Sequence, residues 1–447
     1  MFSESQSQRT GSAITSAIRV LTIMMAALVA AALAPHPAQA WKLKTLYSFC
    51  AKTHCSDGQF PAGPLVRDAA GNLFGVTGYG GYAAAYEPGG VVFELSPVKK
   101  NKWKLSTLYR FCADPPLCSD GYQPMGVIVD TAGNLYGTTG LNGPNGGGTA
   151  FELSPQAKGW ALNTLYAFPY SGEPAAEPSG TLTYAGAAAG ALYDGTSPLF
   201  GLTFNGGTSN LGAAYELSQT GGHWKLTEIH GFGGGPEDGA WPTSSLTMDP
   251  AGNLLGTTGL GGKAGQGTAF TLSPTESGWN ETLLASMGTA PKTPRDPFGP
   301  LWRDASGTLF GTNNYGGQHC HRKGARCGGN VFRLSLEGDT WQYASVHEFC
   351  ADETCLDGAR PAAGVIMDAS GMLIGTTQDG GAHQAGVIFR VRPDGTNYKV
   401  IHDFCGAANC ADGKYPDALT LVPDGHIYGV TIQGGAHNGG TIFELSP

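Results

Sequence analysis

Short segments of alternating apolar and polar residues, bounded by Gly, Asn and Asp, run along most of the chain. One group covers residues 125–168, with segments Met125–Asp130, Leu135–Thr139, Gly148–Leu153 and Ala161–Phe168. Alternation over five to eight residues between turn residues is typical of half-buried β-strands. We therefore predict four strands in this group and name them a, b, c and d in chain order.

The same group of four segments recurs along the chain. Its clearest marker is GNLYGTTG at Gly133–Gly140, which returns as GNLFGVTG from Gly71 and GNLLGTTG from Gly252. The copies are spaced 54 to 64 residues apart, with the central residues Leu73, Leu135, Leu199, Leu254, Leu309, Leu373 and Ile427. A strand-rich repeat of this length indicates the blades of a β-propeller. We predict an all-β fold, a seven-bladed propeller with four-stranded blades.

The order of the strands predicts how the ring closes. A d segment, Trp41–Phe49, precedes the first a segment, and the chain ends on a c segment, Gly440–Pro447. The N-terminal d strand must then complete the last blade, which leaves no open sheet edge. In such blades the d–a and b–c loops lie on one face. Those loops are the longer and more variable ones here, so we expect function on that face.

The residues before the first repeat resemble a targeting segment. Arg9 and Arg19 precede an apolar run at Val20–Ala34, and small residues follow at Ala38–Ala40. The run is short for a membrane span and suits a secretory signal, although a retained N-terminal anchor is the alternative. We predict a signal peptide over 1–40, a propeller over 41–447 without a transmembrane segment, and a secreted or periplasmic location.

Composition supports this organisation. The chain has 447 residues, 70 of them Gly and 28 Pro, with 14% charged residues, which suits many short strands and tight turns. A net charge of -9 argues against a nucleic-acid partner. Ten cysteines form five close pairs, which we predict to be disulfides rather than zinc sites: Cys50 with Cys55, Cys112 with Cys118, Cys320 with Cys327, Cys350 with Cys355, and Cys405 with Cys410.

The repeat strongly resembles the GloVer repeat of exported bacterial proteins. The resemblance is carried by LYSF, DG..P, GNLFGVTGYGG and VVFEL in the first unit, with parallels in all seven, and it covers Trp41–Pro447. It implies export and tandem β repeats, and no chemistry that can be transferred. Members of this family commonly carry a C-terminal surface anchor. This sequence ends on FELSP without an apolar tail, and so departs from the family pattern at this point.

Residues present in most repeats are interpreted as structural. The Asp-Gly pairs of the d–a loops should accept loop hydrogen bonds, and the DxxGN turns should form tight hairpins rather than calcium sites. The strand-d histidines His230, His347 and His402 replace a Tyr of the repeat, and we interpret them as blade-surface residues.

Departures from the repeat give the candidate site residues. His319, His383 and His437 follow the Gly-Gly of three consecutive b–c loops and could contact a ligand, hold a metal or be inert. A cationic insertion adds His321 and Arg322, which suit an anionic partner such as a uronate glycan, or a solvated lobe. At the end of strand b, Tyr79 and Tyr315 could stack on sugar rings, and Asp379 is the candidate acid.

No nucleophile elbow, phosphate loop, dinucleotide fingerprint or zinc-protease motif is present. We therefore predict a non-enzymatic, monomeric propeller that binds an extracellular or envelope ligand, in particular a glycan, with no cofactor and no metal. One alternative is a polysaccharide lyase or glycoside hydrolase acting on an anionic glycan with His383, His437, Tyr315 or Arg322. The other is a structural protein-interaction module.

Overall fold

A computed structural model describes residues 41–81, 88–99, 102–112, 114–171, 174–290, 293–317 and 328–446. The predicted signal peptide and the insertion residues His319, His321 and Arg322 lie outside these residues. Residues Lys42–Ser446 form one compact unit, held together by contacts between them. Apart from three short 3-10 turns, the secondary structure of the described residues is β (η1 Thr53–Cys55, η2 Ala187–Ala189, η3 Ala408–Cys410).

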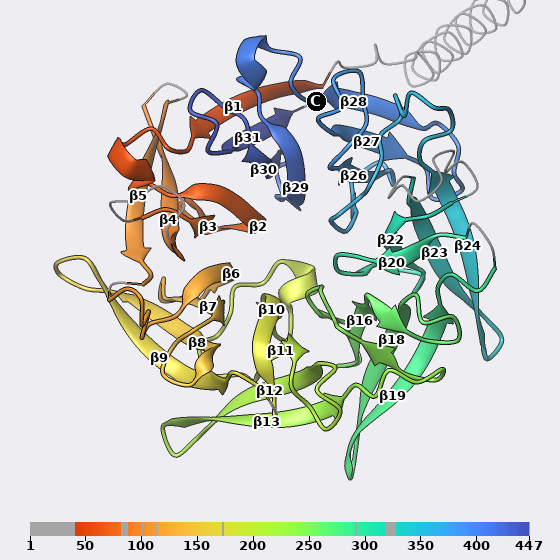
Figure 1. The fold of residues 1–447 in the computed structure, drawn as a ribbon, viewed down its shortest axis with the longest axis horizontal. Helices are drawn as coiled ribbons and strands as arrows, with labels where there is room; N and C mark the ends of the chain where they lie inside the picture. Colours follow the sequence, from red (N-terminus) through yellow and green to blue (C-terminus); the bar gives the residue numbers. More distant parts are fainter. Residues whose placement is uncertain are drawn as a thin grey trace, which may run out of the picture. The chain divides into compact units, whose positions relative to one another are not determined.

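Seven antiparallel sheets of four or five strands are arranged in a ring, with the first strand of each blade nearest the centre (Figure 1), which confirms the predicted seven-bladed propeller. Blade 1 holds β2 Gln59–Arg67, β3 Leu73–Tyr79, β4 Pro88–Val98 and β5 Lys102–Arg110. Blade 2 holds β6 Tyr122–Val129, β7 Leu135–Leu141, β8 Gly146–Pro155 and β9 Trp160–Pro169. Blade 3 holds β10 Ala176–Thr183, β11 Leu199–Asn205, β12 Ala213–Thr220 and β13 His223–Gly231.

Strand a is interrupted in blades 4 to 6. Blade 4 holds β14 Gly239–Ala240, β15 Thr247–Met248, β16 Leu254–Thr258, β17 Leu260–Gly261, β18 Thr268–Thr275 and β19 Gly278–Ser286. Blade 5 holds β20 Arg295–Pro297, β21 Trp302–Arg303, β22 Leu309–Tyr315, β23 Asn330–Glu337 and β24 Thr340–Glu348. Blade 6 holds β25 Ile366–Met367, β26 Leu373–Thr377, β27 Val387–Val391 and β28 Lys399–Asp403.

The last blade closes as the order of segments predicts. It holds β29 Lys414–Leu421, β30 Ile427–Gln433, β31 Thr441–Ser446 and, as its outer strand, β1 Lys42–Ser48. β1 pairs antiparallel with β31 from Lys42 opposite Ser446 to Ser48 opposite Thr441. The two ends of the propeller are therefore joined by backbone hydrogen bonds, and the seventh sheet has no missing strand.

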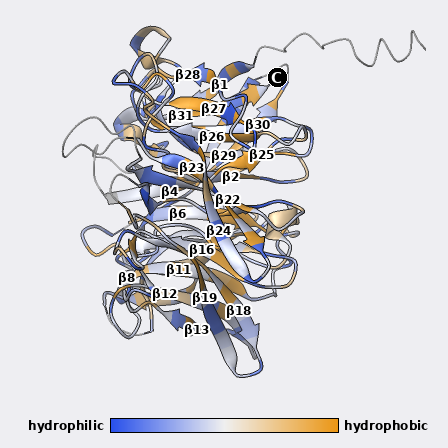
Figure 2. Cartoon of the chain, turned by 90° about the vertical axis from the view of Figure 1, so that its right-hand side faces the viewer, coloured by the Kyte–Doolittle hydropathy of each residue, from blue (hydrophilic) through white to orange (hydrophobic). Residues whose placement is uncertain are grey.

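The hydrophobic core lies between neighbouring blades rather than inside any one of them. At six junctions an aromatic residue at the end of strand d, or directly after it, packs on an aromatic of strand c in the next blade, as Phe49 does on Phe93 at 5.2 Å between ring centroids. Phe49 and Phe93 are completely buried. Figure 2 shows hydrophobic segments within the strands and hydrophilic residues in many connecting loops.

The central Gly of the repeated motif has a packing role. In blade 1 it is Gly75, which pairs with Phe93 of strand c, and the aromatic ring lies over it. A β-carbon on Gly75 would lie 2.7 Å from the ring of Phe93, closer than real side chains approach. The motif recurs because every blade places an aromatic ring against this position.

The d–a and b–c loops lie on the same face, as predicted. The second Gly of the b–c loop donates its N–H to the second Cys of the d–a loop: Gly81 to Cys55, Gly143 to Cys118, Gly381 to Cys355 and Gly435 to Cys410. This contact recurs in four of the blades and holds the two kinds of loop together. No helix among the described residues is long and apolar enough to cross a membrane.

Four of the five predicted disulfides are present in the described part of the chain. They are Cys50–Cys55, Cys112–Cys118, Cys350–Cys355 and Cys405–Cys410, and each closes a d–a loop. The fifth predicted pair, Cys320 and Cys327, falls in the insertion of blade 5, outside the described residues. The disulfide between Cys320 and Cys327 therefore stays a prediction.

Two interpretations of repeated residues are confirmed and one is wrong. In the DxxGN turn of blade 1, Asp68 accepts the N–H groups of Ala70 and Asn72, which makes a tight hairpin. The loop carboxylates accept backbone N–H groups, as Asp357 does from Cys350. The strand-d histidines are not surface residues, because His230, His347 and His402 are half-buried and each contacts a loop carboxylate.

Candidate functional site

One residue in each blade has an unusual backbone conformation at the start of strand a. It directly precedes a Pro that is present in all seven blades, and its φ lies between 53° and 59°, in the left-handed region. The seven residues are Phe60, Gln123, Glu177, Trp241, Asp296, Arg360 and Tyr415. Because strand a lies nearest the centre of the ring (Figure 1), these residues surround the central opening on the face of the long loops.

Contacts between blades explain why this conformation recurs. The N–H of Arg360 donates to the carbonyl of Gly328 in the preceding blade at 2.9 Å, and that of Trp241 donates to Leu211 at 2.8 Å. Phe60, Asp296 and Tyr415 donate in the same way to Gly439, Gln266 and Ala385. At these five positions the backbone geometry therefore connects a blade to its neighbour and does not depend on the side chain.

The side chains at these seven positions do not follow from the backbone. A left-handed φ costs a non-Gly residue about 1 kcal/mol or more, and Gly adopts it freely. The chain uses Gly at 70 other places, yet none of the seven positions carries one. Instead they hold two phenolic or phenyl rings, an indole, two carboxylates, an amide and a guanidinium. Strained positions with chemically different side chains are typical of functional surfaces.

The residue at the end of strand b, or two positions beyond it in blades 4 and 6, is the second variable position. It is Tyr79, Leu141, Asn205, Leu260, Tyr315, Asp379 or Gln433. We call these residues and the seven pre-proline residues together the collar. Within the collar, Gln123 Nε2 donates to the hydroxyl of Tyr79 at 2.7 Å, across a blade junction. Asn205 Nδ2 donates to Glu177 at 2.7 Å, within blade 3.

Two of the predicted site residues meet through Arg360. Its guanidinium donates to Asp379 at 2.7 Å and lies over the ring of Tyr315, 5.6 Å from the centroid. Burial opposes the charge on Arg360, but the hydrogen bond and charge of Asp379 outweigh it and raise its pKa above the ordinary value. Arg360 is thus held charged and oriented between blades 5 and 6.

A cavity of about 510 Å³ opens in the collar between blades 4 and 5. It is lined by Trp241, Leu260, Asp296, Asn314 and Tyr315 among others. Trp241 is 38% exposed, and its ring stacks on Phe204 of blade 3 at 5.5 Å with an interplanar angle of 25°. The volume lies in the range of roughly 300–1,000 Å³ that is common for small-molecule sites.

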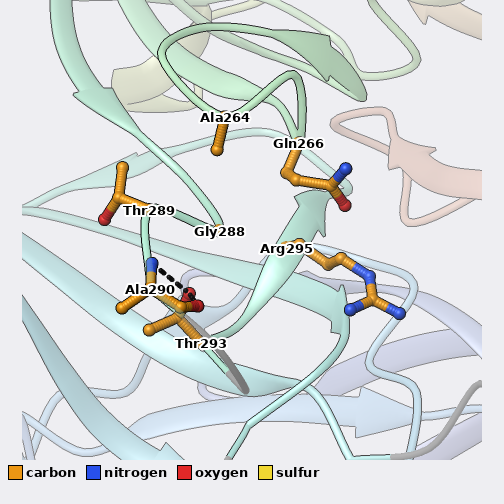
Figure 3. Close-up of a pocket in the computed structure, with 7 residues that line it drawn as sticks. All are labelled: Ala264, Gln266, Gly288, Thr289, Ala290, Thr293 and Arg295. Carbon is orange, nitrogen blue, oxygen red and sulfur yellow. Dashed lines mark hydrogen bonds between the residues drawn. The ribbon is translucent and has the colours of Figure 1, made fainter.

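A second cavity, of about 650 Å³, adjoins the first and shares Gln266 and Arg295 with it (Figure 3). Its other lining residues are small: Ala264, Gly288, Thr289, Ala290 and Thr293. The hydroxyl of Thr293 donates to the carbonyl of Ala290 at 2.6 Å, so the loop satisfies its own polar groups. This cavity offers space beside the collar but few groups to recognise a ligand.

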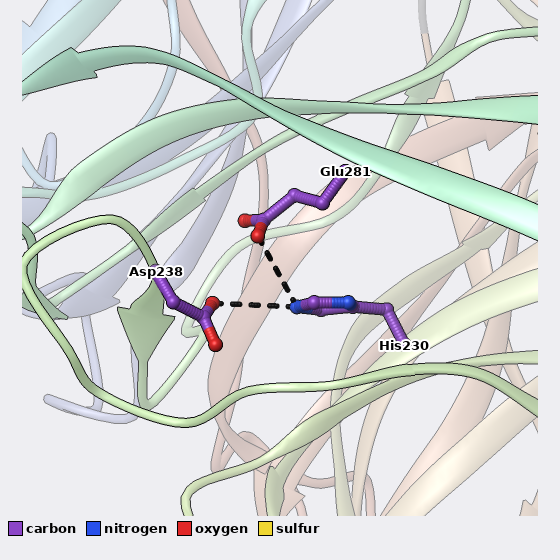
Figure 4. Close-up of side chains that lie close together, drawn as sticks. All are labelled: His230, Asp238 and Glu281. Carbon is purple, nitrogen blue, oxygen red and sulfur yellow. Dashed lines mark hydrogen bonds and ion pairs between the residues drawn. The ribbon is translucent and has the colours of Figure 1, made fainter.

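Away from the collar, one cluster joins His230, Asp238 and Glu281 at the junction of blades 3 and 4 (Figure 4). His230 Nε2 lies 3.3 Å from Asp238 Oδ1 and 3.5 Å from Glu281 Oε2. Glu281 pairs with strand-c Leu272, at a position that is Leu in blades 1, 2, 3 and 7 (Leu105, Leu162, Leu226, Leu43). Among the described residues, His230, Asp238 and Glu281 form a group of three side chains that could hold a metal ion.

The cluster perturbs the ionisation of its members. Burial, together with the nearby carboxylate of Asp238, raises the pKa of Glu281 to about 7. Burial opposes protonation of His230, but the hydrogen bond to Asp238 and the charge of Glu281 outweigh it and raise its pKa. The carboxyl and imidazole thus retain protons to higher pH than usual.

The predicted site residues fall into three groups. Tyr79, Tyr315 and Asp379 belong to the collar, in the contacts described above. His383 and His437 are exposed at the tips of b–c loops in blades 6 and 7, and neither belongs to a three-ligand cluster among the described residues. His319, His321 and Arg322 lie outside the described residues. Their roles in ligand binding stay predictions.

The sequence analysis missed the pre-proline residues, including Trp241, Asp296 and Arg360. The signal was present in the sequence, because two variable residues stand between Asp-Gly and a recurring Pro, in GQFP, GYQP, GAWP, GARP and GKYP. Its left-handed conformation was not predictable, since a residue before Pro usually adopts an extended backbone. Only the structure shows these residues on one rim.

Comparison with known families now decides the relationship of the repeat. The family described as the Gloeobacter/Verrucomicrobia repeat matches residues 36–198, 184–354 and 319–447. The chain belongs to this family. The GloVer resemblance inferred from the motifs is therefore confirmed. A comparison with curated proteins found no match.

Solved structures match the chain only at low similarity. The PQQ-bound form of aldose sugar dehydrogenase from Streptomyces coelicolor is 12% identical, with a TM-score of 0.43, covering 92% of this chain and 99% of that one. A protein from Lactobacillus plantarum is 13% identical, with a TM-score of 0.45, covering 76% of this chain and 84% of that one. Similarities this low transfer no activity to this member of the Gloeobacter/Verrucomicrobia repeat family.

Proposed function

We propose that this protein is an exported, non-enzymatic propeller that binds a glycan through its collar. The observation that carries the proposal is the set of seven left-handed pre-proline positions, where the backbone conformation is constant and the side chains differ. Repeated blades have no structural need for seven different side chains at a position where the left-handed φ is energetically unfavourable. A ligand that contacts several blades at once supplies such a need.

The chemistry of the collar favours a sugar over other ligands. Trp241, Phe60 and Tyr415 supply rings that can cover the apolar face of a pyranose. Gln123, Glu177 and Asp296 supply planar polar groups that can share two hydrogen bonds with neighbouring hydroxyls. Both signs of charge are present, which disfavours a highly charged polymer such as nucleic acid. The four disulfides of the described loops suit the oxidising compartment in which envelope glycans are found.

A glycan array is the direct test of this proposal. The wild-type protein should bind a restricted set of oligosaccharides. A collar variant carrying Trp241→Asn, Arg360→Asn and Tyr415→Asn should lose them, and Asn suits the test because it tolerates a left-handed φ. Leu336→Ala is the matched control, since Leu336 is 55% exposed on β23 outside the collar. An array without hits, or equal binding by the collar variant, would refute the proposal.

One contact favours a second function, cleavage of an anionic glycan by β-elimination. Tyr315 stands beside the charged Arg360, an arrangement that can position a uronate carboxylate next to a phenol acting as base. Incubation with polygalacturonate and alginate, followed by assay for unsaturated ends, separates the two functions. Product that disappears in Tyr315→Phe would establish the lyase; absence of product would leave binding as the function.

A further inference from the structure

The cavity between blades 4 and 5 depends on one residue of strand b. The position before the strand-b end is Phe204 in blade 3, Asn314 in blade 5, Gln378 in blade 6 and Ile432 in blade 7. In blade 4 it is Gly259, whose missing side chain leaves the space that Trp241, Asp296 and Asn314 line. A β-carbon there would lie 3.0 Å from Asp296 Oδ1.

Two other blades carry Gly at the same position without forming this site. At Gly140 of blade 2 the space is occupied by Met125, whose methyl group lies 2.5 Å from where a β-carbon would be. At Gly78 of blade 1 the nearest atom is the carbonyl oxygen of Phe60, 3.8 Å away. Only blade 4, among the described residues, combines the missing side chain with a stacked indole and polar groups around a cavity.

A buried polar group points to a ligand in this cavity. Asn314 lines the cavity and is only 6% exposed, yet its Oδ1 has no hydrogen-bond partner among the described residues. Thr243, which also lines the cavity, likewise has a buried hydroxyl without a partner there. A buried polar group that lacks a partner costs about 1–3 kcal/mol, so native proteins usually satisfy it. Hydroxyl groups of a ligand would satisfy both.

We propose that this cavity is the subsite for one neutral pyranose residue of the glycan. The open face of Trp241, held from behind by Phe204, covers the apolar side of the ring. Asp296 accepts hydrogen bonds from ring hydroxyls, and Asn314 Oδ1 accepts another. Asp296 and Arg295 leave the lining without net charge, which gives a uronate no advantage over a neutral sugar. The assignment rests on the proposed function and identifies its ligand class and location.

Calorimetric titration with soluble tetrasaccharides tests the subsite. The probes are cellotetraose, maltotetraose and mannotetraose, with tetragalacturonate as the anionic counterpart. The wild-type protein should bind at least one neutral tetraose. Gly259→Phe, which copies Phe204 of blade 3 into blade 4, should abolish that binding. Leu336→Phe, on β23 and outside the collar, should leave it unchanged.

A second variant guards against misfolding of Gly259→Phe. Asn314→Leu removes the amide at similar size, and it should weaken binding about tenfold, the loss expected for one hydrogen bond inside a cavity, while circular dichroism stays unchanged. Equal binding by wild type, Gly259→Phe and Asn314→Leu would overturn the subsite and leave the glycan function standing. Binding of tetragalacturonate alone would also overturn it. Failure of every probe, together with an array without hits, would overturn both proposals.

Discussion

Glu281 should make the stability of the propeller fall as the pH rises. Its pKa is about 7 in the folded protein, against an ordinary value of 4.5, because it is buried beside Asp238. Between these values the folded state holds a proton that the unfolded state has released. The stabilisation is therefore complete below pH 4.5 and is lost as the pH rises through about 7.

The magnitude follows from the two pKa values. A change from 4.5 to about 7 corresponds to about 3 kcal/mol at 1.36 kcal/mol per pH unit. Partial access of solvent to the cluster reduces this, so we expect about 2 kcal/mol. His230 acts in the same direction, since its pKa is also raised in the folded state. Asp238 has a lowered pKa, so its contribution is lost only at acid pH, outside this window.

Urea unfolding of wild type and Glu281→Gln across about pH 5 to 8 measures the effect. The Gln side chain mimics the protonated carboxyl, so both proteins should be equally stable near the acid end of the series. At the alkaline end the variant should be more stable by about 2 kcal/mol. Glu276→Gln, on the exposed turn before β19, is the control and should follow wild type. Parallel curves for wild type and Glu281→Gln would refute the reasoning.

Three further changes test the packing. Phe49→Ala should cost about 3–5 kcal/mol by urea unfolding, because it empties a fully buried aromatic contact at the closing blade; a loss below about 1 kcal/mol would contradict the closure. Gly375→Ala should lower the free energy of unfolding by about 1–3 kcal/mol, since its methyl group would lie 2.6 Å from the ring of Phe389. Unchanged stability would show that the ring moves freely. Replacing Cys350 and Cys355 by Ser should cost only about 2 kcal/mol, because the disulfide closes a short loop, and complete unfolding would show a larger structural role.

The architecture was accessible from the sequence because it depends on periodic features. Alternation, Gly-bounded turns and the spacing of the motif define the strands, and the extra d segment at Trp41–Phe49 determines the closure through β1. The interruptions of strand a in blades 4 to 6 were not predicted. In blades 1 and 7, where strand a is continuous, its pairing with strand b contains a register shift near the pre-proline residue, which alternation does not report either.

The candidate site was accessible only in part. Tyr79, Tyr315 and Asp379 were selected because they vary at the end of a constant strand, and they lie in the collar. The pre-proline residues vary just as much but stand in a loop, where variation alone predicts nothing about position. Glu281 was missed for a different reason: a Glu within an alternating strand looks solvent-exposed, whereas here it contacts His230 of the neighbouring blade.

Hydrogen exchange of the wild-type protein with its best array glycan tests the central claim most directly. The account predicts slower exchange at the starts of strand a and the ends of strand b, around Trp241, Asp296, Tyr315 and Arg360. The hairpins of the opposite face, such as Asp68–Asn72, should be unaffected. Protection confined to those hairpins or to the outer strands, with the collar unchanged, would contradict the account.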